Sequence, residues 1–280
     1  MGRSFLIFGC GYLGLRAAEA WLTEGAQVSV VTRSAERARE FAAIGLQPII
    51  GDVVRPETLR DLPACDCLLY SIGYDRTANV SRRAVTVDGL QNALTAVGDR
   101  CGRWIQISST SVYGQIDGEW VDEESLNNSV DESGALQCEA EQLAFTHRNA
   151  SVLRLSGIYG PKRLLSRAES LRAGTPIAGD PEGWLNLIHV DDAVRAVRAA
   201  ADRGVAGRTY LVSDDAPLRR REYYDLLAKL LQCPSPAFSG APGARGTSNK
   251  RCRNSRMKEE LRVTLHFPTV ETGLPAAVDF

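Results

Sequence analysis

The sequence lacks a long apolar run, an excess of charge of one sign and a cluster of metal-binding side chains. No apolar stretch approaches the roughly 18 residues that a membrane span needs, so we expect no membrane partner. The formal net charge of -1 over 280 residues gives no electrostatic reason to expect nucleic acid as a partner. The seven cysteines are scattered, and none lies with histidine at zinc spacing, so we expect reduced thiols and no metal.

The amino-terminal residues also lack the pattern of a secretion signal. Their short apolar run ends in three glycines, and no cleavage-site pattern follows it. Together with the reduced thiols, this favours a cytoplasmic protein. The composition, 44% hydrophobic and 24% charged, is typical of a globular protein, and the length suits one large α/β domain with a smaller lobe.

The chain is organised around a glycine loop at its amino end. The apolar run Phe5–Phe8 is typical of a buried strand, and Gly9, Gly11 and Gly14 follow it with the spacing G-x-G-x-x-G. Gly9 permits a tight turn, Gly11 lets the backbone approach a pyrophosphate, and Gly14 allows the next helix to pack closely on the sheet. The helix N-terminus then directs its N–H groups at the phosphates. This predicts dinucleotide binding, with a purely structural turn as the alternative.

Strand-like and helix-like segments alternate along the rest of the chain, which is typical of a parallel sheet with helices on both faces. We expect further strands at 26–32, 46–50, 67–71, 104–107, 152–155 and 210–213, helices at 85–97, 134–147, 190–202 and 221–231, a polar surface loop at 115–131 and a mobile loop at 233–249. The predicted fold is α/β, a doubly wound Rossmann parallel sheet with a smaller C-terminal substrate lobe. Residues 1–160 form the dinucleotide-binding domain, to which 185–213 return, and residues 161–184 and 214–280 form the lobe.

The end of the second predicted strand indicates which nicotinamide cofactor binds. An NAD site places an acidic residue there against the ribose 2′-hydroxyl, whereas this chain has Thr32, Arg33 and Ser34. The guanidinium of Arg33 matches a 2′-phosphate, which favours NADP and leaves NAD open. The alternative is an arginine that caps a surface turn. Asp52 is expected near the adenine edge, or else is a plain turn residue.

Further cofactor contacts are expected at the strand ends that follow the glycine loop. Ser71-Ile72-Gly73 ends the fourth predicted strand, close to where the cofactor would cross the sheet. The predicted cofactor contacts are Gly9, Gly11, Tyr12, Leu13, Gly14, Thr32, Arg33, Asp52, Ser71, Ile72, Gly73, Ser108 and Ile158.

Four motifs resemble those of a known family. They are Gly-Cys-Gly-Tyr-Leu-Gly at 9–14, Ile-Ser-Ser-Thr-Ser-Val-Tyr-Gly at 107–114, Leu-Arg-Leu-Ser-Gly-Ile-Tyr-Gly-Pro at 153–161 and Leu-Ile-His-Val-Asp-Asp at 187–192. In this order they resemble the extended short-chain dehydrogenase/reductases of the NAD-dependent epimerase/dehydratase group, over nearly the whole chain. The later stretch 250–254, with Met257 and Leu261, is similar to an atypical bacterial subgroup.

The resemblance implies an active site with a Ser or Thr after the fifth strand and a Tyr-x-x-x-Lys pair on the next helix. The tyrosine is the family's acid/base, and the lysine lowers its pKa and holds the ribose. The hydroxyl position falls on Ser109, four residues before Tyr113. Anchored on Glu141, which looks like the family's helix ending, the tyrosine and lysine positions fall on Ser133 and Gln137.

This chain departs from the family at both positions of that pair. A register shift of one residue gives Gly134 and Cys138, so neither register holds a tyrosine or a lysine, and no lysine occurs in residues 1–161. A serine hydroxyl does not take the place of an ionisable phenol near pH 7, and a glutamine supplies no positive charge. The family's usual acid/base chemistry is therefore not expected here.

Three other side chains are candidate replacements for the acid/base. Tyr113 follows the serine run and Tyr159 follows the sixth predicted strand, and both positions more often hold core or cofactor-packing aromatics. His189 has a titration range suited to acid/base work, although a hydrogen-bonded role that ties the lobe to the sheet is the simpler interpretation.

The expected substrate contacts lie after the sixth strand, where open α/β sheets place their crevice. They are Lys162, Arg163, Asn186 and His189, with a solvated basic surface as the alternative. Two hypotheses follow: an NADP-dependent oxidoreductase or epimerase-like enzyme acting on a small sugar-like or anionic metabolite with a non-standard acid/base, or a non-catalytic dinucleotide-binding sensor of the same fold. The expected partner is a small molecule, and a homodimer is left open.

Overall fold

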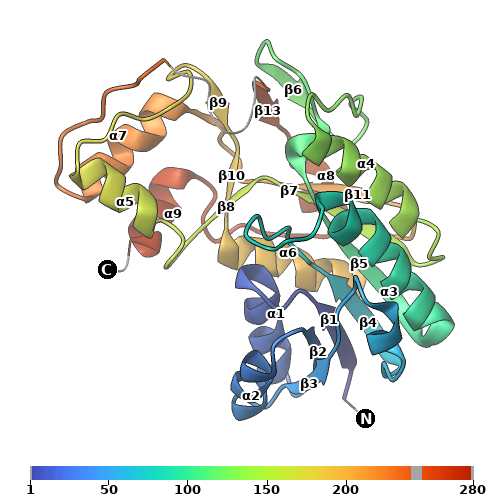
Figure 1. Cartoon of the computed structure of the whole chain (residues 1–280). Helices are drawn as coiled ribbons and strands as arrows, with labels where there is room; N and C mark the ends of the chain where they lie inside the picture. Colours follow the sequence, from blue (N-terminus) through green and yellow to red (C-terminus); the bar gives the residue numbers. More distant parts are fainter. Residues whose placement is uncertain (1, 241–247, 279–280) are drawn as a thin grey trace. The chain divides into compact units, whose positions relative to one another are not determined.

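The computed structural model describes residues 2–240 and 248–278 of the chain. Its main element is a seven-stranded sheet, which Figure 1 shows flanked by helices. The strand order is β11-β7-β5-β4-β1-β2-β3. The β2-β1, β1-β4, β4-β5 and β2-β3 pairs are parallel, which confirms the predicted Rossmann-like α/β class. The strands are β1 Ser4–Phe8, β2 Gln27–Thr32, β3 Gln47–Ile50, β4 Cys65–Tyr70, β5 Cys101–Ser109, β7 Ala150–Leu155 and β11 Thr209–Val212.

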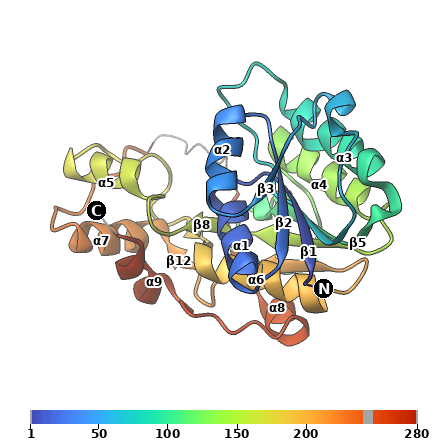
Figure 2. The ribbon, with the colours of Figure 1, turned by 90° about the horizontal axis from the view of Figure 1, so that it is seen from below.

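The helices that connect these strands follow the apolar periodicity of the sequence. Near the amino end, α1 and α2 lie on one side of the sheet and α3 on the other (Figure 2), as right-handed crossovers require. The helices are α1 Tyr12–Thr23, α2 Ala35–Ala43, α3 Gly89–Val97, α4 Glu132–Ala144, α5 Leu165–Arg172, α6 Val190–Arg203, α7 Arg220–Leu230, α8 Ser255–Glu260 and α9 Val270–Ala277. None of the helices in the described ranges has both the length and the apolar content to cross a bilayer.

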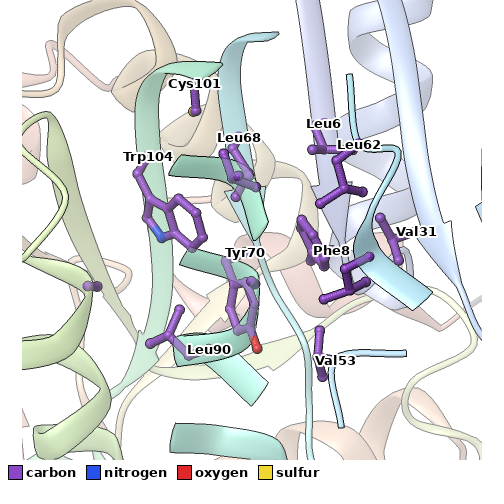
Figure 3. Close-up of a cluster of buried hydrophobic side chains, with 14 of the residues drawn as sticks. Leu6, Phe8, Val31, Val53, Leu62, Leu68, Tyr70, Leu90, Cys101 and Trp104 are labelled. Atoms are coloured by element: carbon purple, nitrogen blue, oxygen red, sulfur yellow. The ribbon is translucent and has the colours of Figure 1, made fainter. Parts of the chain in front are cut away.

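The buried core under α3 is rich in aromatic rings (Figure 3). The rings of Tyr70 and Trp104 lie 5.8 Å apart and nearly parallel, and the ring of Phe8 lies 5.8 Å from Tyr70 on the other side. Leu68 and Leu90 are fully buried in the same cluster. Leu90 comes from α3, whereas the other four side chains lie on one face of β1, β4 and β5. The core thus fixes the central strands whose carboxyl ends carry the predicted cofactor contacts.

The chain divides into two compact units. The first comprises residues 1–109, 135–154 and 197–210, and the second comprises 110–134, 155–196 and 211–280. The segment 110–134 therefore clusters with the second unit, whereas the sequence analysis assigned it to the dinucleotide-binding domain. The second unit contains three short strand pairs, β8 with β10, β9 with β12 and β6 with β13. Their bounds are β6 Glu119–Val121, β8 Gly157–Tyr159, β9 Trp184–Leu185, β10 Leu187–His189, β12 Leu218–Arg219 and β13 Lys250–Cys252.

The structure differs from the two predicted loops at 115–131 and 233–249. The prediction of a loop throughout 115–131 was wrong, because β6 lies inside it and pairs in parallel with β13. A three-residue strand whose partner lies far away in the chain leaves no local periodicity to detect. The predicted loop 233–249 makes a bridge between Ile177 and Phe238, and its residues 241–247 lie outside the described ranges.

Element ends differ from the predictions by a few residues. Strand β5 is longer than the predicted strand at 104–107. Helix α4 begins two residues earlier and ends three residues earlier than the predicted helix at 134–147. The predicted helix at 85–97 begins with a π-helical turn, Ala84–Asp88, that continues into α3. At Gly89 an added Cβ would lie 2.7 Å from the Val53 side chain, so a glycine allows the close approach of this helix to Val53.

Candidate functional site

The glycine loop 9–14 has two glycines that packing requires and one that faces open space. Gly9 has a φ of 88°, and an added Cβ would lie 2.5 Å from the backbone nitrogen of Ile72. An added Cβ at Gly14 would lie 2.4 Å from the carbonyl oxygen of Gly9. At Gly11, by contrast, a Cβ would meet nothing within 4 Å. The space beside Gly11 is the feature that a pyrophosphate needs, and neither local packing nor a positive φ explains the glycine there.

The N-terminus of α1 lies directly behind this space. Gly11 is the N-cap residue, and no side chain caps the helix. The first helical turn contains no acidic residue, and the amide of Leu15 donates to the carbonyl of Gly11 at 2.9 Å. The amides that precede Leu15, on Tyr12, Leu13 and Gly14, are those that a helix N-terminus presents to an anion. The ring of Tyr12 lies 4.1 Å from the Arg16 guanidinium. The loop therefore fits the phosphates of a dinucleotide.

Ser71 holds the glycine loop in place. Its amide donates to the carbonyl of Phe8 at 2.8 Å, and its hydroxyl donates to the carbonyl of Gly9 at 2.9 Å. The predicted cofactor contact at Ser71 is thus a residue that ties the end of β4 to the turn after β1. Ile72 packs against the core, and Gly73 is exposed with open space at its Cβ position.

At the end of β2, two of the three predicted residues have local structural roles. The hydroxyl of Ser34 caps α2 by accepting from the amide of Arg37 at 3.2 Å, and the hydroxyl of Thr32 accepts from the amide of Ser34 at 3.3 Å. Arg33 is exposed, and among the residues that the structure describes it forms no ion pair. Its guanidinium is therefore available for a phosphate.

Arg37 is a further residue at this loop that was not predicted from the sequence. Its guanidinium donates to the carbonyl of Cys10 in the glycine loop at 3.3 Å and also pairs with Glu40 at 3.1 Å. A second cation therefore lies against the loop, four residues after Arg33. The only sequence signal would be this four-residue spacing, because the contact to Cys10 joins residues 27 positions apart.

Asp52 makes the contacts of a turn residue. Its carboxylate accepts from the amide of Val54 at 3.1 Å, and its amide donates to the hydroxyl of Thr58 at 2.8 Å. These bonds shape the chain after β3 and engage one of the two carboxylate oxygens. The turn interpretation of Asp52 accounts for this geometry, and the adenine contact stays a prediction.

Ser108, at the end of β5, belongs to a buried ionic network. Its hydroxyl donates to the carboxylate of Glu141 on α4 at 2.6 Å. The guanidinium of Arg154 on β7 donates to the same carboxylate through Nε at 2.9 Å and Nη2 at 2.6 Å. All three side chains are buried. The network locks the rotation of α4 about its axis relative to β5 and β7, and it engages the hydroxyl of Ser108.

Glu141 also helps to define the register of the residues before it on α4. Ser133, Gln137 and Glu141 are spaced by four residues, so they lie on one face of the helix. In the alternative register, an added Cβ at Gly134 would lie 2.0 Å from the hydroxyl of Ser129 and 2.2 Å from the carbonyl of Ser111. Gly134 thus has no room for a side chain, which favours the register with Ser133 and Gln137. Both of these side chains are half-buried.

The candidate acid/base residues of the second unit are packed in its interior. Tyr113 and Tyr159 are fully buried, and burial raises the pKa of Tyr159 well above its usual range. The ring of His189, 1% exposed, lies 5.2 Å from Tyr159 and 4.2 Å from Phe267. A general base needs a lowered phenol pKa and access to its substrate, so this geometry favours the packing interpretation of the three residues.

The predicted substrate contacts differ in what their side chains do. Lys162 and Arg163 are exposed in the turn before α5, where Lys162 has a φ of 64°. Asn186 instead bonds to β13: its amide nitrogen donates to the carbonyl of Lys250 at 2.9 Å, and its amide oxygen accepts from the amide of Cys252 at 2.6 Å. Ile158 lies half-buried in β8.

Lys250 is the buried member of the four lysines in the chain. Its ammonium donates to the carbonyl of Tyr113 at 2.8 Å and to the hydroxyl of Ser248 at 3.4 Å. The stretch 250–254 therefore holds the turn that follows the serine run at 108–111. The sequence of this stretch alone indicates only a likeness to an atypical bacterial subgroup.

This chain is similar in sequence to a known protein family and to known proteins. The sequence model of the NAD dependent epimerase/dehydratase family matches residues 5–213. The chain is 28% identical to a ketoreductase of a farnesylated dihydroquinoline oxide from Stigmatella aurantiaca, over 80% of this chain and 72% of that one. It is also 28% identical to Protein YeeZ of Escherichia coli, over 94% and 95% of the two chains.

The fold recurs in a solved structure with bound cofactor. The dTDP-glucose 4,6-dehydratase DesIV of Streptomyces venezuelae, with NAD bound, superposes with a TM-score of 0.85 at 22% identity, over 98% of this chain and 95% of that one. Structural neighbours of this chain thus bind NAD. The family match covers most of the chain and includes the glycine loop, β5 and α4, and on this basis the chain belongs to the NAD dependent epimerase/dehydratase family.

Proposed function

We propose that this chain is an NADP-dependent oxidoreductase that acts on a small sugar-like or anionic metabolite. The observation that carries the proposal is the open space at Gly11 in front of an N-terminus of α1 that no side chain caps. At Gly9 and Gly14 neighbouring backbone atoms leave no room for a Cβ, whereas at Gly11 a Cβ would meet nothing. A ketoreductase among the relatives supports an oxidoreductase.

The preference for NADP is proposed from two arginines. Arg33 is exposed at the end of β2 with no carboxylate paired to it in the described ranges, and the guanidinium of Arg37 lies against the glycine loop. A 2′-phosphate would accept charge-assisted hydrogen bonds from them. No acidic residue stands at 32–34 to bind a ribose 2′-hydroxyl instead.

NADP(H) supplies the hydride in such a reaction, and the side chains of this protein have to orient the substrate and move a proton. Ser109 ends β5 beside Ser108, and its hydroxyl is proposed to orient a substrate carbonyl or hydroxyl. Ser133 and Gln137 are proposed to occupy the family's tyrosine and lysine positions on α4. Neither is an acid/base near pH 7, so the proton has to come from another group or from water.

The second candidate function is a dinucleotide-binding sensor without hydride chemistry. The observation that favours it is the pair Ser133 and Gln137, since the register that Glu141 and Gly134 support puts no ionisable group at these positions. Lys162 and Arg163 would serve either function, because exposed cations select an anionic ligand whether or not it reacts.

Binding and turnover measured separately test the proposal. The wild-type chain is titrated with NADPH and NADH, and cofactor oxidation is then followed on a panel of sugar and keto-acid substrates. Gly11→Val places two methyl groups in the open space and should abolish binding of both cofactors, while Gly11→Ala, the matched control, should weaken it less. Folding of each variant is checked by thermal unfolding. Unchanged affinity in a folded Gly11→Val protein would overturn the dinucleotide site, and binding without turnover on the whole panel would favour the sensor.

A further inference from the structure

Three arginines and two tryptophans of the second unit form an alternating row. The guanidinium of Arg219 lies 3.8 Å from the centroid of the Trp184 ring. The guanidinium of Arg251 lies 5.0 Å from the same ring and 4.9 Å from the ring of Trp120. The guanidinium of Arg253 lies 5.6 Å from Trp120. We call these five residues the arginine–tryptophan row.

The strands of the second unit hold this row in place. Trp120 on β6 is the register partner of Arg251 on β13, and Trp184 on β9 is the register partner of Arg219 on β12; β6, β9 and β13 are labelled close together in Figure 1. The Nε of Arg251 donates to the carbonyl of Gly118 at 2.8 Å. The side chain of Asn249 joins β9 to β13 by accepting from the amide of Trp184 at 2.9 Å. A ligand would thus meet donors that are already ordered, which lowers the entropic cost of binding.

Carboxylates lie near the row without pairing with its guanidiniums in the described part of the chain. Within the described part of the chain, none of its three guanidiniums forms an ion pair with a carboxylate. The acidic side chains beside the row have other contacts. The carboxylate of Glu182 pairs with Arg221 at 3.4 Å, and that of Glu119 accepts from the amide of Asp117 at 2.9 Å. An anion placed against the row would therefore not compete with an existing carboxylate.

The geometry of the row suits one class of ligand. A guanidinium stacked on an indole ring keeps the N–H donors on its edge, and these match the oxygens of a carboxylate or a phosphate. Neighbouring guanidiniums share a ring between them, so a ligand with several anionic groups engages more than one. We propose that the arginine–tryptophan row is a binding site for a multiply charged anion. The proposal does not depend on the hydride chemistry proposed above.

The row contains its own reporter. The side chain of Trp120 is 45% exposed, while the tryptophans outside the row, Trp21 and Trp104, are 1% and 0% exposed. Binding at the row should therefore change the emission of Trp120 and Trp184. We would titrate the full chain with inorganic pyrophosphate, with citrate as the carboxylate probe and with acetate as the singly charged probe.

The expected result is a saturable emission change with pyrophosphate or citrate and none with acetate, weakened by added salt. The affinity of Arg251→Met should fall about ten-fold or more, as the loss of a charge-assisted contact predicts. Arg251→Lys keeps the positive charge but loses the planar pair of N–H donors, so its affinity should be intermediate. Arg60→Met removes an exposed arginine of the first unit and should bind as the wild type does. Tighter binding of pyrophosphate than of citrate would indicate a phosphate ligand, and the reverse order would indicate a carboxylate ligand.

Two further variants serve as controls. Arg253→Ser, at an exposed side chain, replaces Arg251→Met if the latter unfolds, and it should also weaken binding. Gly11→Val should retain the anion site, since the glycine loop is not part of the row. No saturable change in the wild type, or equal affinities of the folded Arg253→Ser and Arg60→Met proteins, would overturn the proposal. So would loss of pyrophosphate binding in Gly11→Val with retention in Arg253→Ser. Titration with NADPH in parallel tests the cofactor site independently.

Discussion

The carboxylate of Glu141 on α4 and the guanidinium of Arg154 on β7 form a buried, bidentate ion pair. The Nη2 to Oε2 distance is 2.6 Å and the Nε to Oε1 distance is 2.9 Å. The same carboxylate accepts from Ser108 at 2.6 Å. Three elements of the first unit thus meet at one side chain, and the face of α4 that carries Gln137 is set by it.

Breaking this pair should destabilise the fold strongly. Glu141→Gln leaves the charge of Arg154 buried without its carboxylate, and such losses cost about 3–5 kcal/mol. Glu141→Leu combined with Arg154→Met removes both charges and should cost less than the sum of the single changes. Urea unfolding of the wild type, Glu141→Leu, Arg154→Met and the double variant checks this, and additive losses of the two single variants would show that the two side chains do not act as a pair.

Arg33 should control the choice between NADPH and NADH. Arg33→Ala removes a charge-assisted contact with the 2′-phosphate, so NADPH affinity should fall about ten- to hundred-fold while NADH affinity stays unchanged. Titration of both cofactors by fluorescence measures the effect. Arg39→Ala, which removes an exposed arginine on α2, is the matched control. Equal affinities of the wild type for both cofactors would show that Arg33 does not bind a phosphate.

Asp214 should make the protein less stable as the pH rises. Burial raises the pKa of this carboxyl to about 8 from an ordinary value of 3.8. Between these two values the folded state holds a proton that the unfolded state has lost, so stability falls as the pH goes from about 4 to about 8. Each unit of pKa displacement corresponds to about 1.4 kcal/mol, so even part of this shift is measurable.

The variant Asp214→Asn isolates this effect, since an amide keeps the oxygen that accepts from the amide of Ala216 at 3.3 Å and does not titrate. The stability of the variant relative to the wild type, from thermal unfolding at pH 5, 6, 7 and 8, should increase steadily with pH. A difference that stays constant over this range would mean that Asp214 is charged in the folded protein.

The double change Ser133→Tyr with Gln137→Lys should test the position of the missing pair. It puts a phenol and an ammonium four residues apart on one face of α4, as the family arranges them. General acid/base assistance is worth about 10²- to 10⁴-fold, so turnover of any substrate that the wild type accepts should rise. The matched pair Gly134→Tyr with Cys138→Lys should fail to fold, because Gly134 has no room for a Cβ. Unchanged turnover in a folded Ser133→Tyr, Gln137→Lys protein that still binds the cofactor would refute the assignment.

Local chemistry explains which parts of the site could be predicted from the sequence. The glycine loop follows from sterics over six residues, and Gly9 and Gly14 meet the close contacts that their spacing predicts. Contacts between distant residues leave no such pattern. The bond from Arg37 to Cys10 depends on how α2 is placed relative to the turn that follows β1. From the sequence, Asn186 could contact a substrate or bond to another strand. Its bonds to Lys250 and Cys252 on β13 follow from the folded arrangement of distant segments.

The division of the chain has a consequence for protein engineering. Each unit is assembled from three separate stretches, with crossings after residues 109, 134, 154, 196 and 210. A truncation near residue 160 would therefore keep segment 110–134 while removing β13, which pairs with β6 inside it. It would also remove β11 from the edge of the large sheet. Exchanging the second unit for that of a relative thus calls for several coordinated replacements, and a single splice point would leave both units incomplete.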